Sequence, residues 1–294
     1  MHGWLFVDKP EGVTSFAVVS LVRRFLAVKK VGHAGTLDPL ASGLLALAVG
    51  EATKTIPFVM EGQKVYDFVI GWGHQTQTDD REGAVLYRSS WRPSIEEIRN
   101  CLAEFTGTLS QIPPRYSAIK IKGKRAYQMV RAGQEVDLQP REVQIFDFQH
   151  VERIDADRDR FQVTCSKGTY IRSLARDLGL KLGCYGYALA IRRLQSGIFS
   201  ITDTISLENL CHLGHNKELQ KHLSSIPDVL DGIPAVRIGS IQEQRLRCGQ
   251  SIDGTLLAEH KAHTVVLCLA DQDRPIGLCY YEDQTLKPMR LFNI

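Results

Sequence analysis

One short segment combines a single carboxylate with an unusual number of small residues. It reads GHAGTLDPLASG over residues 32–43 and predicts a loop that leads into a short helical turn. Small residues let a planar ligand approach closely, and Asp38 could then stabilise positive charge or attack a carbon atom. The structural alternative is that Asp38 caps a helix beginning at Pro39. Both interpretations stay open, because a helix N-terminus also favours an ionised carboxylate.

Two arginines and a tyrosine could complete such a site. Arg172 and Arg176 are one turn apart in a segment, residues 169–178, with helical spacing of its apolar residues. Either guanidinium could pair with a buried carboxylate and lower its pKa, or simply face solvent or phosphate. Tyr66 lies in an alternating segment, residues 64–72, which predicts a strand. Its ring belongs either to the core or to a surface on which a nucleobase stacks.

Positive charge is concentrated in two parts of the chain, although the net charge is only +3. Residues 112–141 carry seven basic and two acidic side chains, and residues 166–193 carry six and one. Such segments suit a polyanion, with an ordinary solvated surface as the alternative. The first is polar, is interrupted by Gly123 and Gly133, and predicts a long excursion from the core with one short helix at 126–132.

Length and composition indicate an ordinary globular protein. The 294 residues are 44% hydrophobic and 23% charged, enough for a large domain and a small one. The apolar stretches are too short to span a membrane and the first residues do not resemble a signal peptide, which predicts a cytoplasmic protein without membrane contact. The seven cysteines are scattered and lack C-x-x-C spacing, so we expect neither a disulfide framework nor a metal site.

Helix and strand patterns interleave without a strict βαβ rhythm. This predicts an α+β fold, with a mixed or antiparallel sheet and flanking helices. After a turn at residues 227–234, the pattern changes to short apolar strands at 264–270 and 275–281. We therefore predict a first domain over residues 1–233 and a small β-rich domain over residues 234–294.

The sequence also resembles a known family. GHAGTLDPLASGLLALAVGEATK resembles the signature of the TruB-type tRNA pseudouridine-55 synthases, which isomerise uridine 55 in the T loop of tRNA. Further blocks follow in the family's order: DKPEGVTS, KVYDFVIGWGHQTQTDDREG, IPPRYSAIKIKGKRAYQMVRAG, and CSKGTYIRSLARDLG with IRRLQSG. Together they span residues 8 to about 197, and their coincidence is far more specific than any one block. One departure, Trp72-Gly73 where the family usually has Leu-Gly, concerns local packing and not the chemistry.

The resemblance implies roles for individual residues. Asp38 would be the catalytic aspartate and Arg172 its ion-pair partner. Tyr66 would stack against the flipped uracil and accept the proton from its C5. Substrate-binding residues would be Lys9, Pro10, His33, Lys64, Asp80 and Leu194, and the RNA backbone would be bound by Lys120, Lys122, Lys124, Arg125, Arg131 and Lys167.

The resemblance also implies a fold and a partner. A pseudouridine-synthase catalytic domain would carry an RNA-clamping insertion at residues 112–141, and a small PUA-type barrel would follow from residue 234. The partner would be the T stem-loop of tRNA, bound by a monomer that needs no other protein. Because the isomerisation moves the base from N1 to C5 without gaining or losing electrons, no cofactor is expected.

Other functions remain open from the sequence. The protein could act mainly as a tRNA-folding chaperone that binds the T arm. It could also be an RNA N-glycosidase that releases free uracil, or a synthase that depends on a guide RNA and partner proteins. The lack of long basic extensions favours a stand-alone enzyme. The sequence also leaves open whether Asp38 attacks C1′ or C6, or whether a glycal forms.

Overall fold

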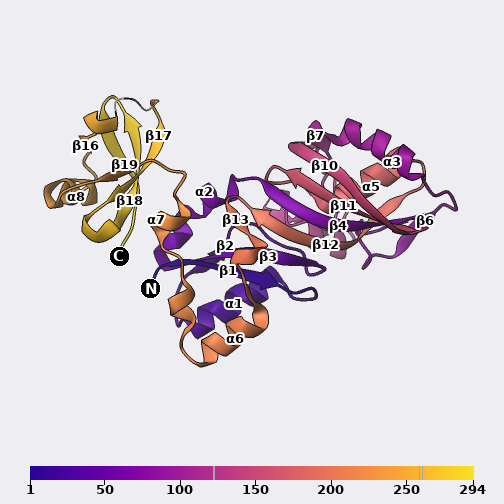
Figure 1. Cartoon of the computed structure of the whole chain (residues 1–294), viewed down its shortest axis with the longest axis horizontal. Coiled ribbons are helices and arrows are strands. Elements are labelled where there is room, and N and C mark those ends of the chain that lie inside the picture. Colours follow the sequence, from indigo (N-terminus) through magenta and orange to yellow (C-terminus); the bar gives the residue numbers. More distant parts are fainter. Residues whose placement is uncertain (122, 258, 260) are drawn as a thin grey trace.

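The fold has a ten-stranded sheet with flanking helices and a separate five-stranded sheet (Figure 1). The computed structural model describes residues 1–121, 123–257, 259 and 261–294. In spatial order the large sheet contains β14 (Ile205–Ser206), β1 (Gly3–Lys9), β3 (Ala41–Val49), β12 (Gly186–Ser196), β4 (Lys64–Trp72), β11 (Arg158–Cys165), β10 (Arg141–Asp155) and β7 (Gly107–Gln111), with β2 (Val31–His33) beside β3 and β13 (Phe199–Ser200) beside β12.

Strand directions in the large sheet are mixed. β12 pairs with β3 in parallel and β1 with β14 in parallel, whereas the other neighbours are antiparallel. The expected α+β class with a mixed sheet is therefore confirmed. Two short hairpins stand apart from the sheet: β5 (His74–Thr76) with β6 (Val85–Arg88), and β8 (Lys120–Ile121) with β9 (Lys124–Arg125).

Helices pack against opposite ends of the large sheet (Figure 1). At one end α1 (Ser15–Phe25) and α6 (Leu207–His215) contact each other. α1 also packs on β2 and β3, and α6 packs on β1. At the other, α5 (Ile171–Lys181) packs on β12 and β4, next to α3 (Ile95–Leu102). Shorter helices are α2 (Ile56–Met60), α4 (Ala126–Arg131), α7 (Ile226–Val229) and α8 (Ser240–Arg247).

Within the described ranges, no helix has the length and apolar character needed to cross a membrane.

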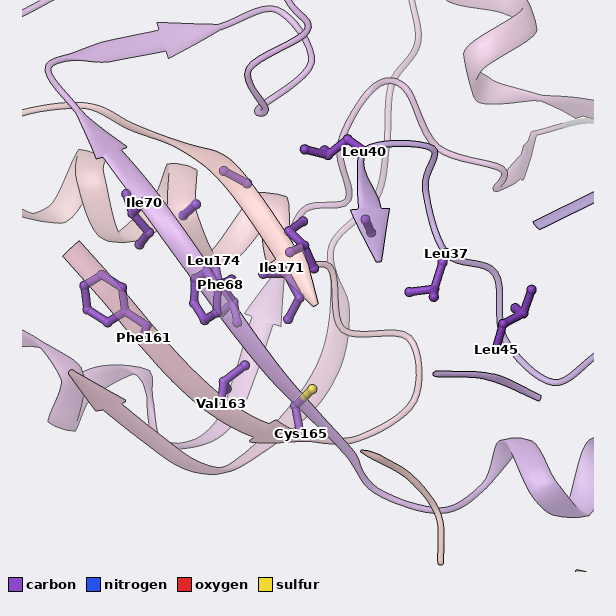
Figure 2. Close-up of a cluster of buried hydrophobic side chains, with 14 of the residues drawn as sticks. Leu37, Leu40, Leu45, Phe68, Ile70, Phe161, Val163, Cys165, Ile171 and Leu174 are labelled. Atoms are coloured by element: carbon purple, nitrogen blue, oxygen red, sulfur yellow. The ribbon is translucent and has the colours of Figure 1, made fainter. Parts of the chain in front are cut away.

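One apolar core connects the segment that carries Asp38 to the helix that carries Arg172. Leu37 and Leu40, which flank Asp38 on its loop, belong to the same buried cluster as Phe68 of β4 and Ile171 of α5 (Figure 2). The strands contribute alternate residues to this cluster, as their period of two requires. Packing therefore fixes the two segments relative to each other.

The expected helical turn at Pro39 is wrong. After β2 the chain forms a loop over residues 34–40 and enters β3 directly at Ala41. The turn is closed by the Ala41 N–H, which donates to the Asp38 carbonyl at 3.0 Å. β3 is buried along almost its whole length between β1 and β12, and this non-local burial outweighs the local cap signal.

Trp72, the departure from the family pattern, is accommodated by a buried polar group. Its indole Nε1 donates to Oδ2 of Asp159 at 2.7 Å, and both residues are almost fully buried. The same carboxylate accepts from Arg153 Nε at 3.1 Å and lies 2.7 Å from His150 Nε2. The larger side chain thus has a hydrogen-bond partner as well as apolar neighbours.

The small sheet packs against the first body of the molecule. Its Phe292 and Leu278 share one buried cluster with Trp4 of β1 and Leu230 after α7. This joint core makes the small sheet an integral support for β1. Its strands are β15 (Ala235–Arg237), β17 (Thr264–Leu269), β18 (Pro275–Glu282), β19 (Thr285–Leu291) and β16 (Ile252–Asp253).

The C-terminal β-rich region is thus confirmed. The boundary between residues 233 and 234 and the assignment of a PUA-type barrel stay predictions.

Gly43 lies where β3 and β12 approach most closely. Its φ is +103°, and a Cβ atom there would lie 2.3 Å from the Arg193 carbonyl oxygen. We predict that Gly43→Ala lowers the free energy of unfolding by about 3 kcal/mol, because both the backbone angle and the strand contact resist a side chain. Urea denaturation measures the change.

The matched control is Gly232→Ala, because an added Cβ at Gly232 meets nothing within 4 Å. It should change the free energy of unfolding by less than about 0.5 kcal/mol. Equal stability of the two variants would contradict the close approach of β3 and β12.

Candidate functional site

A cleft of about 290 Å³ has Asp38 in its wall. This volume is at the small end of the range for ligand pockets. Five separate segments meet around it, so the site exists only in the folded chain. Its lining residues include Ala34 to Asp38 from the loop, Lys64 and Tyr66 from β4, Ser117 and Ala118 from the insertion, Ser166 to Arg172 at the start of α5, and Ile191 and Arg193 from β12.

Arg172 and Asp38 form an ion pair at the cleft. Arg172 Nη2 lies 2.8 Å from Asp38 Oδ2; the arginine side chain is 4% exposed and the aspartate side chain 41%. The guanidinium also donates to the carbonyls of Thr78 at 2.9 Å and Tyr116 at 3.0 Å, and its Nη1 lies 3.5 Å from Asp80 Oδ2. The guanidinium is thus fixed from behind, and the carboxylate is left facing the cleft.

Asp80 is a buried partner of Arg172 and does not line the cleft. The hydroxyl of Thr78 donates to its Oδ1, and the backbone N–H of Glu82 donates to the same oxygen at 3.0 Å. These contacts orient its second oxygen toward Arg172. Asp80 is therefore a positioning residue: its Oδ2 holds the Arg172 guanidinium from the side away from the cleft.

Tyr66 lines the cleft from β4, directly opposite Arg193 of β12 in the strand register. Arg193 is 2% exposed, and its guanidinium donates to the carbonyls of Leu44 at 2.7 Å and Gly35 at 3.1 Å. Burial raises the pKa of the Tyr66 phenol, with the charge of Arg193 acting in the opposite direction. The ring is therefore a neutral surface on one wall of the cleft at neutral pH.

Lys9 is fully buried at the end of β1 and supports the Asp38 loop from behind. Its Nζ donates to the carbonyls of Pro10 at 2.8 Å, Val13 at 2.7 Å and Pro39 at 3.4 Å. Burial lowers the pKa of Lys9 to about 8, against the attraction of Asp38. Neither Lys9 nor Pro10 lines the cleft.

Lys64 and Lys167 both line the cleft, in different environments. Lys64 is buried, and its Nζ donates to the carbonyls of Met60 at 2.8 Å and Gly62 at 2.5 Å. Burial lowers the pKa of Lys64 to about 8. Lys167 is exposed and forms an ion pair with Glu61.

The remaining expected residues lie outside the cleft lining. His33 is half-buried in β2, and Leu194 is half-buried at a bulge of β12. Lys122 lies outside the described residues. The other expected cations of the insertion are exposed, and none is ion-paired to a described carboxylate: Lys120, Lys124, Arg125 and Arg131.

The polar lining residues that the sequence did not single out include Ser117, Tyr170 and Arg193. All three lie inside the blocks that carry the family resemblance, which was the available signal. Ser117 is buried, and its Oγ has no hydrogen-bond partner in the described part of the chain. Alternation along β12 places Arg193 on the same face as Ile191, another lining residue.

Among the residues that the structure describes, no group of three or more His, Cys, Asp or Glu side chains is arranged to hold a metal ion.

The lowered pKa of Lys9 makes stability depend on pH. The folded chain releases this proton near pH 8, whereas the unfolded chain keeps it to about the ordinary value of 10.5. In this window the unfolded chain binds more protons, so the free energy of unfolding rises with pH. We predict that from pH 8 to pH 10 the wild type gains about 2 kcal/mol relative to Lys9→Met.

Urea denaturation at several pH values measures this difference. Lys64 shifts stability in the same direction, but it is present in both proteins and cancels in the comparison. Parallel pH profiles for wild type and Lys9→Met would show that Lys9 keeps its ordinary pKa.

Two family models match the sequence. "TruB family pseudouridylate synthase (N terminal domain)" matches residues 23–171, and "tRNA pseudouridylate synthase B C-terminal domain" matches residues 172–231. The chain is 45% identical over 303 residues to "tRNA pseudouridine synthase B" of Rhodopseudomonas palustris, covering 100% of this chain and 81% of that protein. It is 42% identical over 301 residues to the protein of the same name from Rhodospirillum rubrum, covering 100% and 97%.

Solved structures support the same fold. One is titled "Structure of H/ACA RNP bound to a substrate RNA containing 2'-deoxyuridine"; it is 20% identical, with a TM-score of 0.75 over 99% of this chain and 85% of that one. A second, an archaeal box H/ACA sRNP Nop10-Cbf5 complex, is 21% identical, with a TM-score of 0.73 over 98% and 85%. The resemblance seen in the sequence blocks is confirmed, and the chain belongs to the TruB family of pseudouridylate synthases.

Proposed function

We propose that this chain converts uridine 55 in the T loop of tRNA to pseudouridine, with Asp38 as the catalytic carboxylate. The observation that carries the proposal is the ion pair in which a buried Arg172 holds a partly exposed Asp38 at the cleft. The relatives named tRNA pseudouridine synthase B support tRNA as the substrate.

The reaction requires one ionised carboxylate near the ribose C1′ atom. The N1–C1′ bond breaks, a C5–C1′ bond forms, C5 loses a proton and N1 gains one, so atoms and electrons balance. Charge develops on the ribose and on the departing base, and a carboxylate lowers this barrier by electrostatic stabilisation or by covalent attack. Attack at C1′, attack at C6 and a glycal route all use Asp38 in its ionised form.

Arg172 holds the carboxylate of Asp38 in a fixed orientation. A charge-assisted hydrogen bond to a guanidinium has a strong directional preference and so orients the carboxylate. Because the other contacts of the guanidinium are on buried or backbone oxygens, Arg172 cannot follow Asp38 if the carboxylate rotates. The carboxylate is therefore held before the substrate arrives, which removes part of the cost of orientation.

Tyr66 offers a surface for the flipped base. Taking a nucleotide out of its stack costs a few kcal/mol, and stacking on an aromatic ring returns roughly 1–3 kcal/mol. We assign Leu194 to packing against the base and His33 to the gap that the nucleotide leaves. Because the Tyr66 phenol is neutral, we assign its hydroxyl to relay the C5 proton, accepting it while releasing its own proton to water.

Exposed cations of the insertion bind the RNA backbone in this proposal. Lys120, Lys124, Arg125 and Arg131 are not neutralised by described carboxylates, so they are available for phosphates. The insertion also lines the cleft through Ser117. The same segment thus joins backbone binding to the catalytic cleft.

Catalysis fits the site better than a tRNA-folding role alone. A carboxylate in an RNA-binding cleft repels phosphates, so Asp38 would weaken a site that served binding only. We further propose that the chain acts as a monomer, without an obligatory protein partner, in the cytoplasm where tRNA is used. Activity of the purified chain alone on a transcript tests the partner requirement.

We predict that Asp38→Asn lowers the rate of pseudouridine formation by a factor of at least about 1000, because the neutral amide cannot stabilise positive charge. The substrate is an unmodified T-arm transcript, and carbodiimide labelling with primer extension maps the product. The matched control is Asp67→Asn on β4, whose carboxylate pairs with Arg160 at 2.9 Å. It should keep near-normal activity.

Two results of this assay would contradict the proposal: no pseudouridine with the wild type, or unchanged product with Asp38→Asn. Free uracil in place of the rearranged nucleoside would instead identify an N-glycosidase. Binding of the transcript by Asp38→Asn, measured by filter retention, separates lost chemistry from lost affinity.

We also predict that Arg172→Lys lowers kcat about 100-fold with little change in RNA affinity, because an ammonium cannot reach all four oxygens at once. Arg158→Lys, in an exposed pair with Asp155, is the control. A wild-type kcat in Arg172→Lys would contradict the orienting role of Arg172.

A further inference from the structure

The outward side of α1 carries cations that the proposed active site does not use. Arg23 and Arg24 lie in its last turn, and Lys29 and Lys30 follow it. All four are exposed, and none is ion-paired to a carboxylate of the described residues. The chain has no acidic residue at all from residue 12 to residue 37.

Small residues on α1 and directly after it leave room between these cations. Ala17, Ser20 and Ala27 line a shallow groove together with Arg23 and Lys29. A floor of small side chains lets an extended backbone approach the helix closely, while the cations beside it attract negative charge. The groove is therefore complementary to a phosphodiester backbone in both shape and charge.

The opposite end of α1 touches the proposed active site. The Ser15 hydroxyl donates to the Leu37 carbonyl at 2.8 Å and accepts from the Leu37 N–H at 2.9 Å, one residue before Asp38. Next to Ser15, the ring of Phe16 is 71% exposed, and an exposed aromatic ring is a stacking surface for a base. The helix spans about 16 Å, so its outward face leads from the active-site loop to the cations.

α1 and the insertion approach the cleft from different walls. The insertion contributes Ser117 and Ala118 to the lining, whereas α1 packs behind the loop of residues 34–38. Nucleotides held in the cleft can therefore continue onto either surface. The apolar side of α1, formed by Val18 and Val22, is buried in the core, so the helix has no apolar stripe left to enter a membrane.

We propose that the outward face of α1 and the following turn, residues 16–30, bind the sugar–phosphate backbone of the substrate tRNA outside the nucleotides that enter the cleft. This inference rests on the proposed function, because it takes tRNA as the ligand. It adds a second RNA-binding surface to the insertion, on the other side of the Asp38 loop.

The test compares two double variants that remove the same charge. Arg23→Gln/Lys29→Gln changes the α1 face, and Arg99→Gln/Lys181→Gln changes exposed positions on α3 and α5 at the other end of the sheet. All four positions are exposed, and thermal unfolding checks that each variant keeps its fold. The probes are a full-length unmodified tRNA transcript and its isolated T-arm stem-loop.

We expect the α1 variant to raise the Kd and KM for full-length tRNA about 10-fold at 0.1 M salt, with kcat unchanged. The slope of log Kd against log salt concentration should fall by about two, because two cations no longer neutralise phosphates. The control variant should change the Kd less than about twofold, because its charges lie away from the RNA path.

The T-arm stem-loop shows which part of the tRNA this face binds. An increase in Kd equal to that for full-length tRNA puts the binding on the T stem, and a smaller increase puts it on the rest of the tRNA; both support the proposal. The same Kd for the α1 variant and the control on both RNAs overturns it and leaves this face to an acidic protein partner. A wild type that binds tRNA but forms no pseudouridine would contradict the proposed function and leave this proposal standing.

Discussion

The buried guanidinium of Arg172 is the constraint on which the geometry of the site depends. Removing a full charge from water is costly unless every strong partner is in place. Here two carboxylates and two backbone carbonyls surround its Nη atoms, while the buried Nε has no hydrogen-bond partner among the described residues. Asp38 is the one acceptor among them that lines the cleft with its side chain. Because Asp80 and the carbonyls hold Arg172 from the protein side, the ion pair can fix Asp38 without being moved by it. Because Arg172 is buried and Asp38 is partly exposed, the ion pair orients the Asp38 carboxylate toward the cleft.

Two further buried cations extend this logic to the loop itself. Lys9 binds the carbonyl that follows Asp38, at Pro39, and Arg193 binds the carbonyl of Gly35 near the start of the loop. The Pro39 carbonyl also accepts from the Gly12 N–H at 2.8 Å. Each cation adds a charge-assisted contact to a loop carbonyl, so loop and cations stabilise each other. A loop braced in this way can be as well ordered as a helix terminus. This explains why the site needs no helix at Pro39.

Local sequence patterns predicted the secondary-structure elements well, but they predicted the long-range contacts between those elements poorly. The alternation that predicted β4 and the helical spacing that predicted α5 depend on neighbouring residues, and both elements are present. The helical turn at Pro39 was wrong because burial of β3 between two distant strands decides that segment. The pairing of Asp38 with Arg172 came from the family resemblance, since no local rule relates residues so far apart in sequence. Arg193 was missed for the same reason, because its role follows from its place between β3 and β4.

Burial divides the cations of this protein into two functional groups. Arg172, Arg193, Lys9 and Lys64 are buried and committed to fixed oxygens, whereas those of the insertion and α1 are exposed and have no described carboxylate partners. Exposed charges act on RNA through water and are screened within about 10 Å at 0.1 M salt, whereas buried pairs are screened far less. Salt can therefore weaken tRNA binding while the Asp38–Arg172 geometry stays intact. The proposed chemistry brings a polyanion to a site that carries a negatively charged carboxylate. The exposed cations of the insertion and α1 attract the RNA, while the buried guanidinium of Arg172 balances the charge of Asp38 next to the ribose.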